Sequence, residues 1–356
     1  MNYKVPLKNP SPDITNAIKI IMGESPIKNH PPLVEYLIDP VHMKRIIEMI
    51  GENWSDERTK SLDNYIECWY RLGYDYVRIE RDAGFATGGK EVADTTVKER
   101  TRKWVTMKSG IINTWDDFER YPWPEKEDID RVLEDIMYIN NHLPEGMGLI
   151  ASHGGGIYER LSQIMGYGNL CVSLYENPEL VEAVTKKIGT IMENFYNKLV
   201  QFEHLVAVWP GDDMGYKTAT LISPHHLRKY VLPWHKRFAH IAHQAGKPYF
   251  LHSCGNVLEI MNDLIEDIGM DAKHSFEDGI ISIIEFQKIY GKRIGVLGGV
   301  DVDVLARQDE DGVRRYTRKI IEECAPCGRF AVGSGNSIPT YIPLENYFAM
   351  LDETLK

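Results

Sequence analysis

The sequence has few cysteines, no long apolar run and no excess of positive charge. Five cysteines among 356 residues are odd in number and too sparse for a disulfide framework, so we expect reduced thiols. No stretch reaches the roughly 18 to 20 apolar residues of a membrane-spanning helix, and the opening MNYKVPLKNPSPD lacks the apolar segment of a signal peptide. These absences predict a cytoplasmic protein with no membrane partner.

The charge balance argues against nucleic acid as a partner. There are 41 basic and 52 acidic residues, and the formal net charge of −11 repels phosphate backbones. The 43% hydrophobic and 26% charged contents are those of an ordinary globular protein. We expect one large domain that acts on a small molecule, and the sequence does not indicate its oligomeric state.

Amphipathic helices are the clearest elements of the pattern. In the segment 223–245, Ser223 can cap the helix and Pro224 suits its first position, and Gly246 can end it. Pro233 lies inside this segment and predicts a kink or a split. A second long helix is predicted to begin at Asn177-Pro178.

Short apolar runs lie between the helices, and runs of this kind are typical of strands buried on both faces. The seven candidates are Tyr74–Ile79, Met147–Ala151, Leu205–Trp209, Pro248–Leu251, Asp271–Ala272, Arg293–Leu297 and Phe330–Val332. Alternation of strand and helix predicts a parallel α/β fold, either a (β/α)8 TIM barrel or an open doubly wound sheet, and the length favours the barrel.

The first 72 residues are predicted to be an N-terminal helical extension packed on a barrel of residues 73–356. They contain no convincing strand, and helices are expected over 40–50 and 56–71. The stretch Arg81–Glu127 is too long for an ordinary connection. It is either an insertion over the active site or a surface excursion.

Chemically active side chains recur where the predicted strands end, which is the face that carries the active site in such barrels. We expect five of these polar residues, from strand ends or the turns that follow them, to bind substrate: Glu80, Arg81, His153, Arg160 and Ser334. Four others are candidates for catalysis: Asp212, Asp213, His274 and Asn336.

His252 and Cys254 carry the most specific hypothesis. An imidazole and a thiolate two residues apart, where a strand opens into a turn, can share a zinc ion, and a catalytic zinc needs a third protein ligand and one open position. Asp212, Asp213 and His274 are the candidates for that ligand. The alternative is that His252 is a core or substrate-binding histidine and Cys254 a small buried residue.

Adjacent strand residues point to opposite faces, so at most one of Asp212 and Asp213 should face the barrel interior. The other interpretation of either aspartate is a helix N-terminal cap or a carboxylate in a turn. His274 is either a substrate-binding or a buried structural histidine.

Two further motifs are given structural interpretations. Cys324 and Cys327 form a C-x-x-C motif, but it precedes a strand and should lie at the barrel end opposite Cys254. The run Gly154-Gly155-Gly156 before a helix can bind an anion or simply make a tight turn, and it lacks the fingerprint of a nucleotide site.

The carboxyl-terminal part of the chain resembles the uroporphyrinogen decarboxylase superfamily, which includes corrinoid-dependent methyltransferases. The resemblance covers residues 147–356 and rests on four segments in order: LISPHHLRKYVLPWHKRF, HSCGNVLEIMNDLIEDIGMDAKHSFE, GVLGGVDVDVL and GRFAVGSGNSIPTYIPLENYFAML. It implies a barrel enzyme.

The methyltransferase branch has the H-x-C motif, here His252 and Cys254, completed by a cysteine in the last loop, where this chain has Asn336. The resemblance thus implies a zinc-dependent methyltransferase that works with a corrinoid on a partner protein. A carboxylate in place of a thiolate favours oxygen ligands and hence an oxygen-bearing methyl donor.

Two alternatives remain. A cofactor-free decarboxylase of a tetrapyrrole carboxylate would use Asp212 or Asp213 to stabilise a cationic pyrrole, but the arginine-rich amino-terminal segment of the decarboxylase has no counterpart here, and Asn336 stands where its last loop has a histidine. A non-catalytic corrinoid or tetrapyrrole binding protein is the second alternative.

Overall fold

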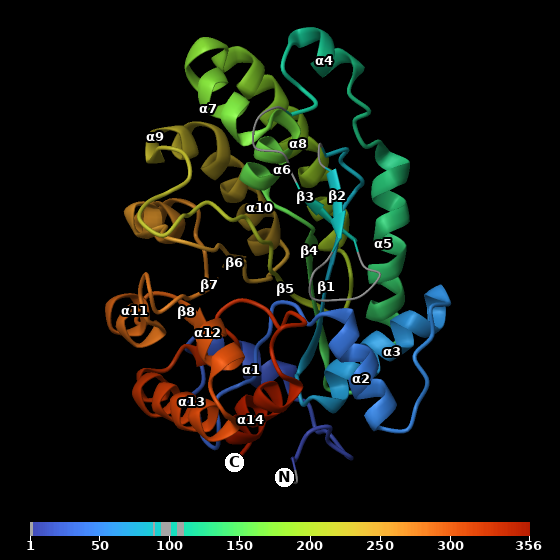
Figure 1. The fold of residues 1–356 in the computed structure, drawn as a ribbon, viewed down its shortest axis with the longest axis vertical. Helices are drawn as coiled ribbons and strands as arrows, with labels where there is room; N and C mark the ends of the chain where they lie inside the picture. Colours follow the sequence, from blue (N-terminus) through green and yellow to red (C-terminus); the bar gives the residue numbers. More distant parts are fainter. Residues whose placement is uncertain (1–2, 88–89, 94–100, 105–109) are drawn as a thin grey trace.

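The computed structural model describes residues 3–87, 90–93, 101–104 and 110–356. Its central strands run parallel in two sheets, of order β1-β4-β5 and β6-β7-β8-β9. They are β1 (Tyr76–Arg81), β4 (Gly148–His153), β5 (Leu205–Val208), β6 (Phe250–His252), β7 (Ala272–His274), β8 (Gly295–Leu297) and β9 (Phe330–Ala331). Figure 1 shows them in the middle of the molecule, with helices around them and both chain ends on one side.

Isolated parallel bridges connect the two sheets and add one further segment beside β9. Val208 pairs with Tyr249 and Gly211 with His252, which connects β5 to β6. On the far side, Leu33 pairs with Val332 and Ile38 with Ile338, so that residues 32–38 occupy the eighth strand position. The predicted (β/α)8 barrel is confirmed.

The segment 32–38 meets β1 through side chains. The Tyr76 hydroxyl donates to the Glu35 carbonyl over 2.9 Å and accepts from the Glu35 N–H over 2.7 Å. No strand is assigned in the described part of the first 70 residues, as expected, but the run Leu-Val-Glu-Tyr-Leu-Ile makes two isolated strand-like bridges, and its glutamate hides this from the sequence pattern. The division of the chain at residue 72 stays a prediction.

Helices precede this segment, follow it and connect the strands. Before β4 lie α1 (Ile14–Ile21), α2 (Pro40–Met49), α3 (Arg58–Arg71), α4 (Trp115–Arg120) and α5 (Lys126–Asn141). Between β4 and β6 lie α6 (Ile157–Met165), α7 (Tyr167–Glu176), α8 (Pro178–Leu199), α9 (Pro224–His226), the π-helical η1 (Leu227–Val231) and α10 (Leu232–Gln244). The remainder are η2 (Leu258–Ile260), η3 (Asp263–Asp267), α11 (Ile283–Tyr290), α12 (Val302–Arg307), α13 (Glu310–Cys324), η4 (Ala325–Cys327) and α14 (Leu344–Thr354).

Two predicted helices show how local sequence sets the elements. The side chain of Asp39 accepts from the Val41 N–H and caps α2, whose first residue is Pro40. The segment that contains Pro233 is helical without a break from Pro224 to Gln244, but a π-helical turn, η1, comes directly before α10, whose second residue is this proline.

The long connection after β1 contains two antiparallel paired strands, β2 (Lys90–Ala93) and β3 (Thr101–Trp104). The hypothesis that this connection covers the active site falls partly on residues outside those described. In the described part of the chain, no helix is long and apolar enough to cross a membrane.

Candidate metal centre

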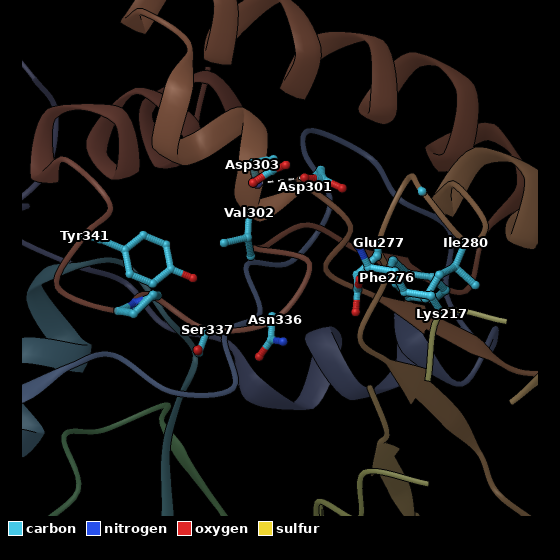
Figure 2. A pocket seen from close by; sticks show the side chains of 12 residues that line it. Lys217, Phe276, Glu277, Ile280, Asp301, Val302, Asp303, Asn336, Ser337 and Tyr341 are labelled. Carbon is cyan, nitrogen blue, oxygen red and sulfur yellow. Dashed lines mark hydrogen bonds between the residues drawn. The ribbon is translucent and has the colours of Figure 1, made fainter. Parts of the chain in front are cut away.

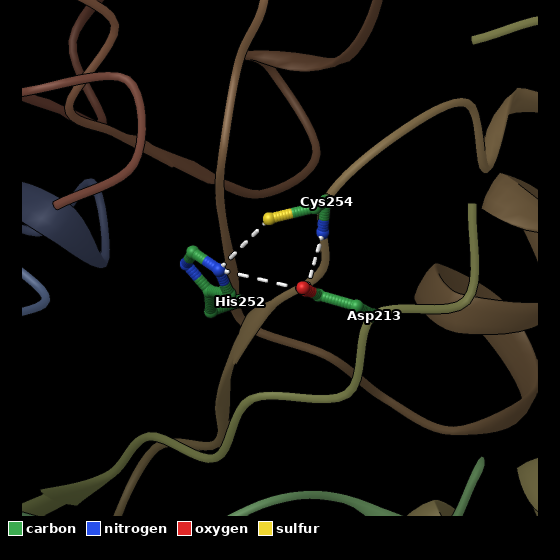
Figure 3. A group of neighbouring side chains, drawn as sticks. All are labelled: Asp213, His252 and Cys254. Carbon is green, nitrogen blue, oxygen red and sulfur yellow. Dashed lines mark hydrogen bonds and ion pairs between the residues drawn. The ribbon is translucent and has the colours of Figure 1, made fainter. Parts of the chain in front are cut away.

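Three side chains with metal-binding atoms meet after the carboxyl ends of β5 and β6. The carboxylate of Asp213, the imidazole of His252 and the sulfur of Cys254 each place one ligand atom within 4.8 Å of the others. His252 Nε2 lies 3.3 Å from Cys254 Sγ and 3.6 Å from Asp213 Oδ1. Figure 3 shows all three groups pointing toward one another.

Close backbone packing brings these residues together. The Cys254 N–H donates to Asp213 Oδ1 over 2.9 Å, and the Ser253 hydroxyl donates to the Asp212 carbonyl over 2.7 Å. A Cβ atom on Gly255, whose φ is +76°, would lie 2.2 Å from the Gly215 carbonyl carbon. Glycine therefore allows the turn after His252 to contact the loop after β5.

Burial sets the protonation of the three groups in the absence of a metal. It lowers the pKa of His252 well below its usual value, so the imidazole is neutral and retains a lone pair. Burial and the nearby Asp213 raise the pKa of the Cys254 thiol, and burial raises that of Asp213. A nitrogen, a sulfur and an oxygen donor form a ligand set that zinc accepts, and metal binding would release the thiol proton.

Asn336 and His274 border the cluster. Asn336 Nδ2 donates to Cys254 Sγ over 3.2 Å, so this amide contacts the sulfur directly. His274 Nδ1 lies 2.7 Å from His252 Nδ1, on the other side of that ring from the cluster. It contacts a candidate ligand and does not offer a ligand atom to the group itself.

Asp212 lies outside the cluster and is completely buried. Its carboxylate accepts from the backbone N–H groups of Tyr158 and Glu159, at 3.0 Å each, and contacts His235 Nε2 at 2.8 Å. A Cβ atom on Gly156 would lie 2.1 Å from Asp212 Cγ. The absence of a side chain at Gly156 therefore leaves room for a carboxylate at the start of α6, and the carboxylate that occupies this position is that of Asp212.

A cavity of about 290 Å³ adjoins the cluster. Of the predicted substrate-binding residues, Glu80 and Arg160 line it, together with Asp213, His252 and Asn336. The other lining residues are Tyr36, Leu37, Gly155, Glu159, Gln163, Gly211 and Ser337. The Arg160 guanidinium pairs with Asp82 at 2.7 Å.

The other three predicted substrate-binding residues do not line this cavity. Arg81 pairs with Asp135 at 2.9 Å and borders a separate hollow. His153 is completely buried and accepts from the Ala83 N–H over 3.1 Å. Ser334 is also buried, and its hydroxyl donates to Glu35. Their roles in substrate binding remain predictions.

A second cavity, of about 500 Å³, shares Asn336 and Ser337 with the first. Figure 2 shows these two residues between Tyr341 on one side and Phe276 and Glu277 on the other. The two cavities thus meet beside the amide that contacts Cys254.

The profile of the family described as uroporphyrinogen decarboxylase (URO-D) matches residues 65–356. The chain belongs to this family. No curated protein gave a match to the sequence.

Solved structures share the fold at low identity. A methyltransferase from Methanosarcina mazei is similar with a TM-score of 0.69 and 17% identity, over 97% of this chain and 98% of that one. A B12-independent methionine synthase from Shewanella sp. W3-18-1 has a TM-score of 0.52 and 10% identity, over 92% and 96% of the two chains. Members of this superfamily include decarboxylases and methyltransferases. The chain therefore belongs to a family of enzymes and has their fold.

Several residues of the site escaped the sequence analysis. Tyr36 stacks on the His252 ring, with centroids 4.0 Å apart, and the neighbouring Glu35 is completely buried. Glu159 lines the smaller cavity, and burial, with help from Asp213, raises its pKa to about 8. The position of Glu35 inside an apolar run was a sequence signal for a buried, functional carboxyl. Glu159 lies in the first turn of an ordinary amphipathic helix, and its sequence context carries no such signal.

The C-x-x-C motif lies apart from the cluster, as predicted. Cys324 ends α13 and Cys327 ends η4, both before the amino end of β9, whereas Cys254 follows the carboxyl end of β6. Cys324 is buried and Cys327 is exposed.

Proposed function

We propose that this protein is a zinc-dependent methyltransferase that passes a methyl group between a small substrate and a corrinoid carried by a partner protein. The observation that carries the proposal is the convergence of Asp213, His252 and Cys254 beside a cavity at the mouth of the barrel. Membership of the URO-D family and the likeness to a methyltransferase fold support it.

The donor set suits a catalytic zinc, which takes three protein ligands and keeps a fourth position for substrate. When bound, zinc would act as a Lewis acid that makes a substrate sulfur or oxygen a better nucleophile or leaving group. A carboxylate in place of a second thiolate makes this site harder, and therefore better suited to an oxygen-bearing substrate.

The residues around the cluster have defined parts in this proposal. Asn336 donates a hydrogen bond to Cys254 Sγ and so stabilises negative charge on the sulfur. Glu159, with its pKa near 8, holds a proton at neutral pH inside the substrate cavity. That proton is available to an oxygen that loses its methyl group.

The family description also supports a second candidate, decarboxylation of a tetrapyrrole carboxylate. In that case Asp213 would stabilise the cationic intermediate, because Asp212 is engaged by α6. Among the described residues that line the two cavities, however, Lys217 and Arg160 are the lysines and arginines present, and Arg160 is paired with Asp82. A polycarboxylate would find few partners.

The test uses the zinc-loaded protein with free cob(I)alamin and a panel of methoxylated small molecules, followed by the absorbance of methylcobalamin. We expect methyl transfer by the wild type and by Cys171→Ala, a control cysteine on α7. Cys254→Ala should lose at least about 100-fold in rate, since it removes a proposed metal ligand. Carbon dioxide release from uroporphyrinogen without methyl transfer would favour the decarboxylase instead.

A further inference from the structure

A series of buried hydrogen bonds leads from His252 away from the cluster. His252 Nδ1 lies 2.7 Å from His274 Nδ1, and His274 Nε2 lies 3.2 Å from the Ser334 carbonyl oxygen. All three residues are buried. A short contact between two ring nitrogens requires one to donate and the other to accept.

The carbonyl at the end of the series fixes the direction of both bonds. A carbonyl oxygen only accepts, so His274 Nε2 carries the hydrogen, and Nδ1 of a neutral His274 accepts. His252 must then donate from Nδ1, which leaves the lone pair on Nε2. That nitrogen is the one that lies 3.3 Å from Cys254 Sγ and 3.6 Å from Asp213 Oδ1.

Stacking fixes the plane of the same imidazole. The Tyr36 ring lies 4.0 Å from that of His252, at an angle of 15°. The Arg78 guanidinium lies over the Tyr36 ring, 3.5 Å from its centroid. A ring held by stacking and by one nitrogen has little freedom to turn its other nitrogen away from the cluster.

Glu35 connects the two supports. One carboxyl oxygen accepts from the Ser334 hydroxyl at 2.7 Å and from the Tyr36 N–H at 3.0 Å, and the other faces the Ser334 N–H at 3.3 Å. The residue therefore holds both the carbonyl that orients His274 and the ring that stacks on His252.

We infer that His274 is a positioning residue, which sets the tautomer and orientation of His252 so that its Nε2 lone pair faces a bound metal ion, and that Glu35 anchors this arrangement. The inference rests on the proposed zinc site. Hydrogen bonds to the second nitrogen of a metal-binding histidine act in this way, by fixing the tautomer and raising the basicity of the ligand.

Metal affinity tests the inference, with Co²⁺ as the probe and its thiolate charge-transfer absorption as the signal. His274→Leu removes both hydrogen bonds and should weaken Co²⁺ binding by about 10- to 100-fold. His274→Gln can accept from His252 and donate to Ser334, and should recover most of that loss. His42→Leu, which removes another buried histidine bonded to a carbonyl, should leave the affinity unchanged. Equal affinity of His274→Leu and wild type would overturn the inference.

The tautomer can be measured without metal. In protein labelled with ¹⁵N in its histidines, long-range ¹H–¹⁵N spectra should show the His252 proton on Nδ1 in the wild type and in His274→Gln. A mixture of tautomers is expected in His274→Leu. If the Nδ1–H form is found but no metal binds, the proposed function fails, while the control of the His252 tautomer by His274 stands. If His252 carries its proton on Nε2 in the wild type, the positioning role fails even where metal binds.

Discussion

Replacing Glu35 by glutamine should change how the stability of the protein depends on pH. Burial raises the pKa of this carboxyl from 4.5 to about 8. The folded state therefore holds the proton more tightly than the unfolded state. The stability that this group contributes is fully present below the unfolded pKa and is lost as pH rises toward the folded pKa. Glutamine is close in shape to the protonated form and does not titrate.

The size of the stability difference between the two proteins follows from the pH range between the unfolded and folded pKa values of Glu35. Between pH 5.5 and 7.5 the unfolded carboxyl is ionised while the folded one is mostly protonated, so each pH unit costs the wild type about 1.4 kcal/mol. The free energy of unfolding of Glu35→Gln, relative to wild type, should rise by roughly 2 to 3 kcal/mol over this range. Below pH 4.5 the two proteins should be nearly equally stable.

Urea unfolding at the two pH values, followed by tryptophan fluorescence, measures this difference. Other titrating groups are shared by the two proteins and cancel in the comparison. Glu48→Gln, which changes an exposed carboxyl on α2, is the control and should show no such dependence. A gap between Glu35→Gln and wild type that is the same at both pH values would refute the assignment of a protonated, buried Glu35.

Three further pairs of substitutions separate structural from metal-binding roles. Asp213→Asn should lower zinc affinity at least about tenfold in a chelator competition, because it removes a proposed ligand. Asp212→Asn should lower the melting temperature but leave zinc affinity within about threefold of wild type, because Asp212 holds α6 and is not a proposed ligand. Gly156→Ala should lower the free energy of unfolding, measured in urea, by about 1 to 3 kcal/mol, because its added Cβ would clash with Asp212. Gly154→Ala should lower it by less than about 1 kcal/mol, because the nearest atom to its added Cβ is 3.5 Å away. Asn336→Cys should tighten zinc binding in the same competition, because it adds a thiolate beside Cys254, and Asn336→Ser should not.

The barrel could be predicted because its strands are buried on both faces. All residues of β4, β6 and β8 are buried, and strands of this kind appear in the sequence as largely apolar runs between helices. The segment 32–38 could not be found in this way, because Glu35 interrupts its pattern. Its partners, Ser334 and Tyr76, are distant in the sequence.

The candidate metal centre was predictable in part. The spacing of His252 and Cys254 at the end of a strand indicated two donors, and alternation along a strand indicated that at most one of Asp212 and Asp213 would join them. Which one does so depends on the approach of α6 to Asp212, a tertiary contact that local sequence does not encode. The same holds for the contact of His274 with His252, since the two lie on neighbouring strands.

Zinc content is the most direct test of the proposed metal centre. Protein produced in zinc-containing medium and freed of loosely bound metal should contain about one zinc per chain in the wild type and in Cys171→Ala, and far less in Cys254→Ala. A wild-type protein with almost no zinc, and with the same content after Cys254→Ala, would contradict the account.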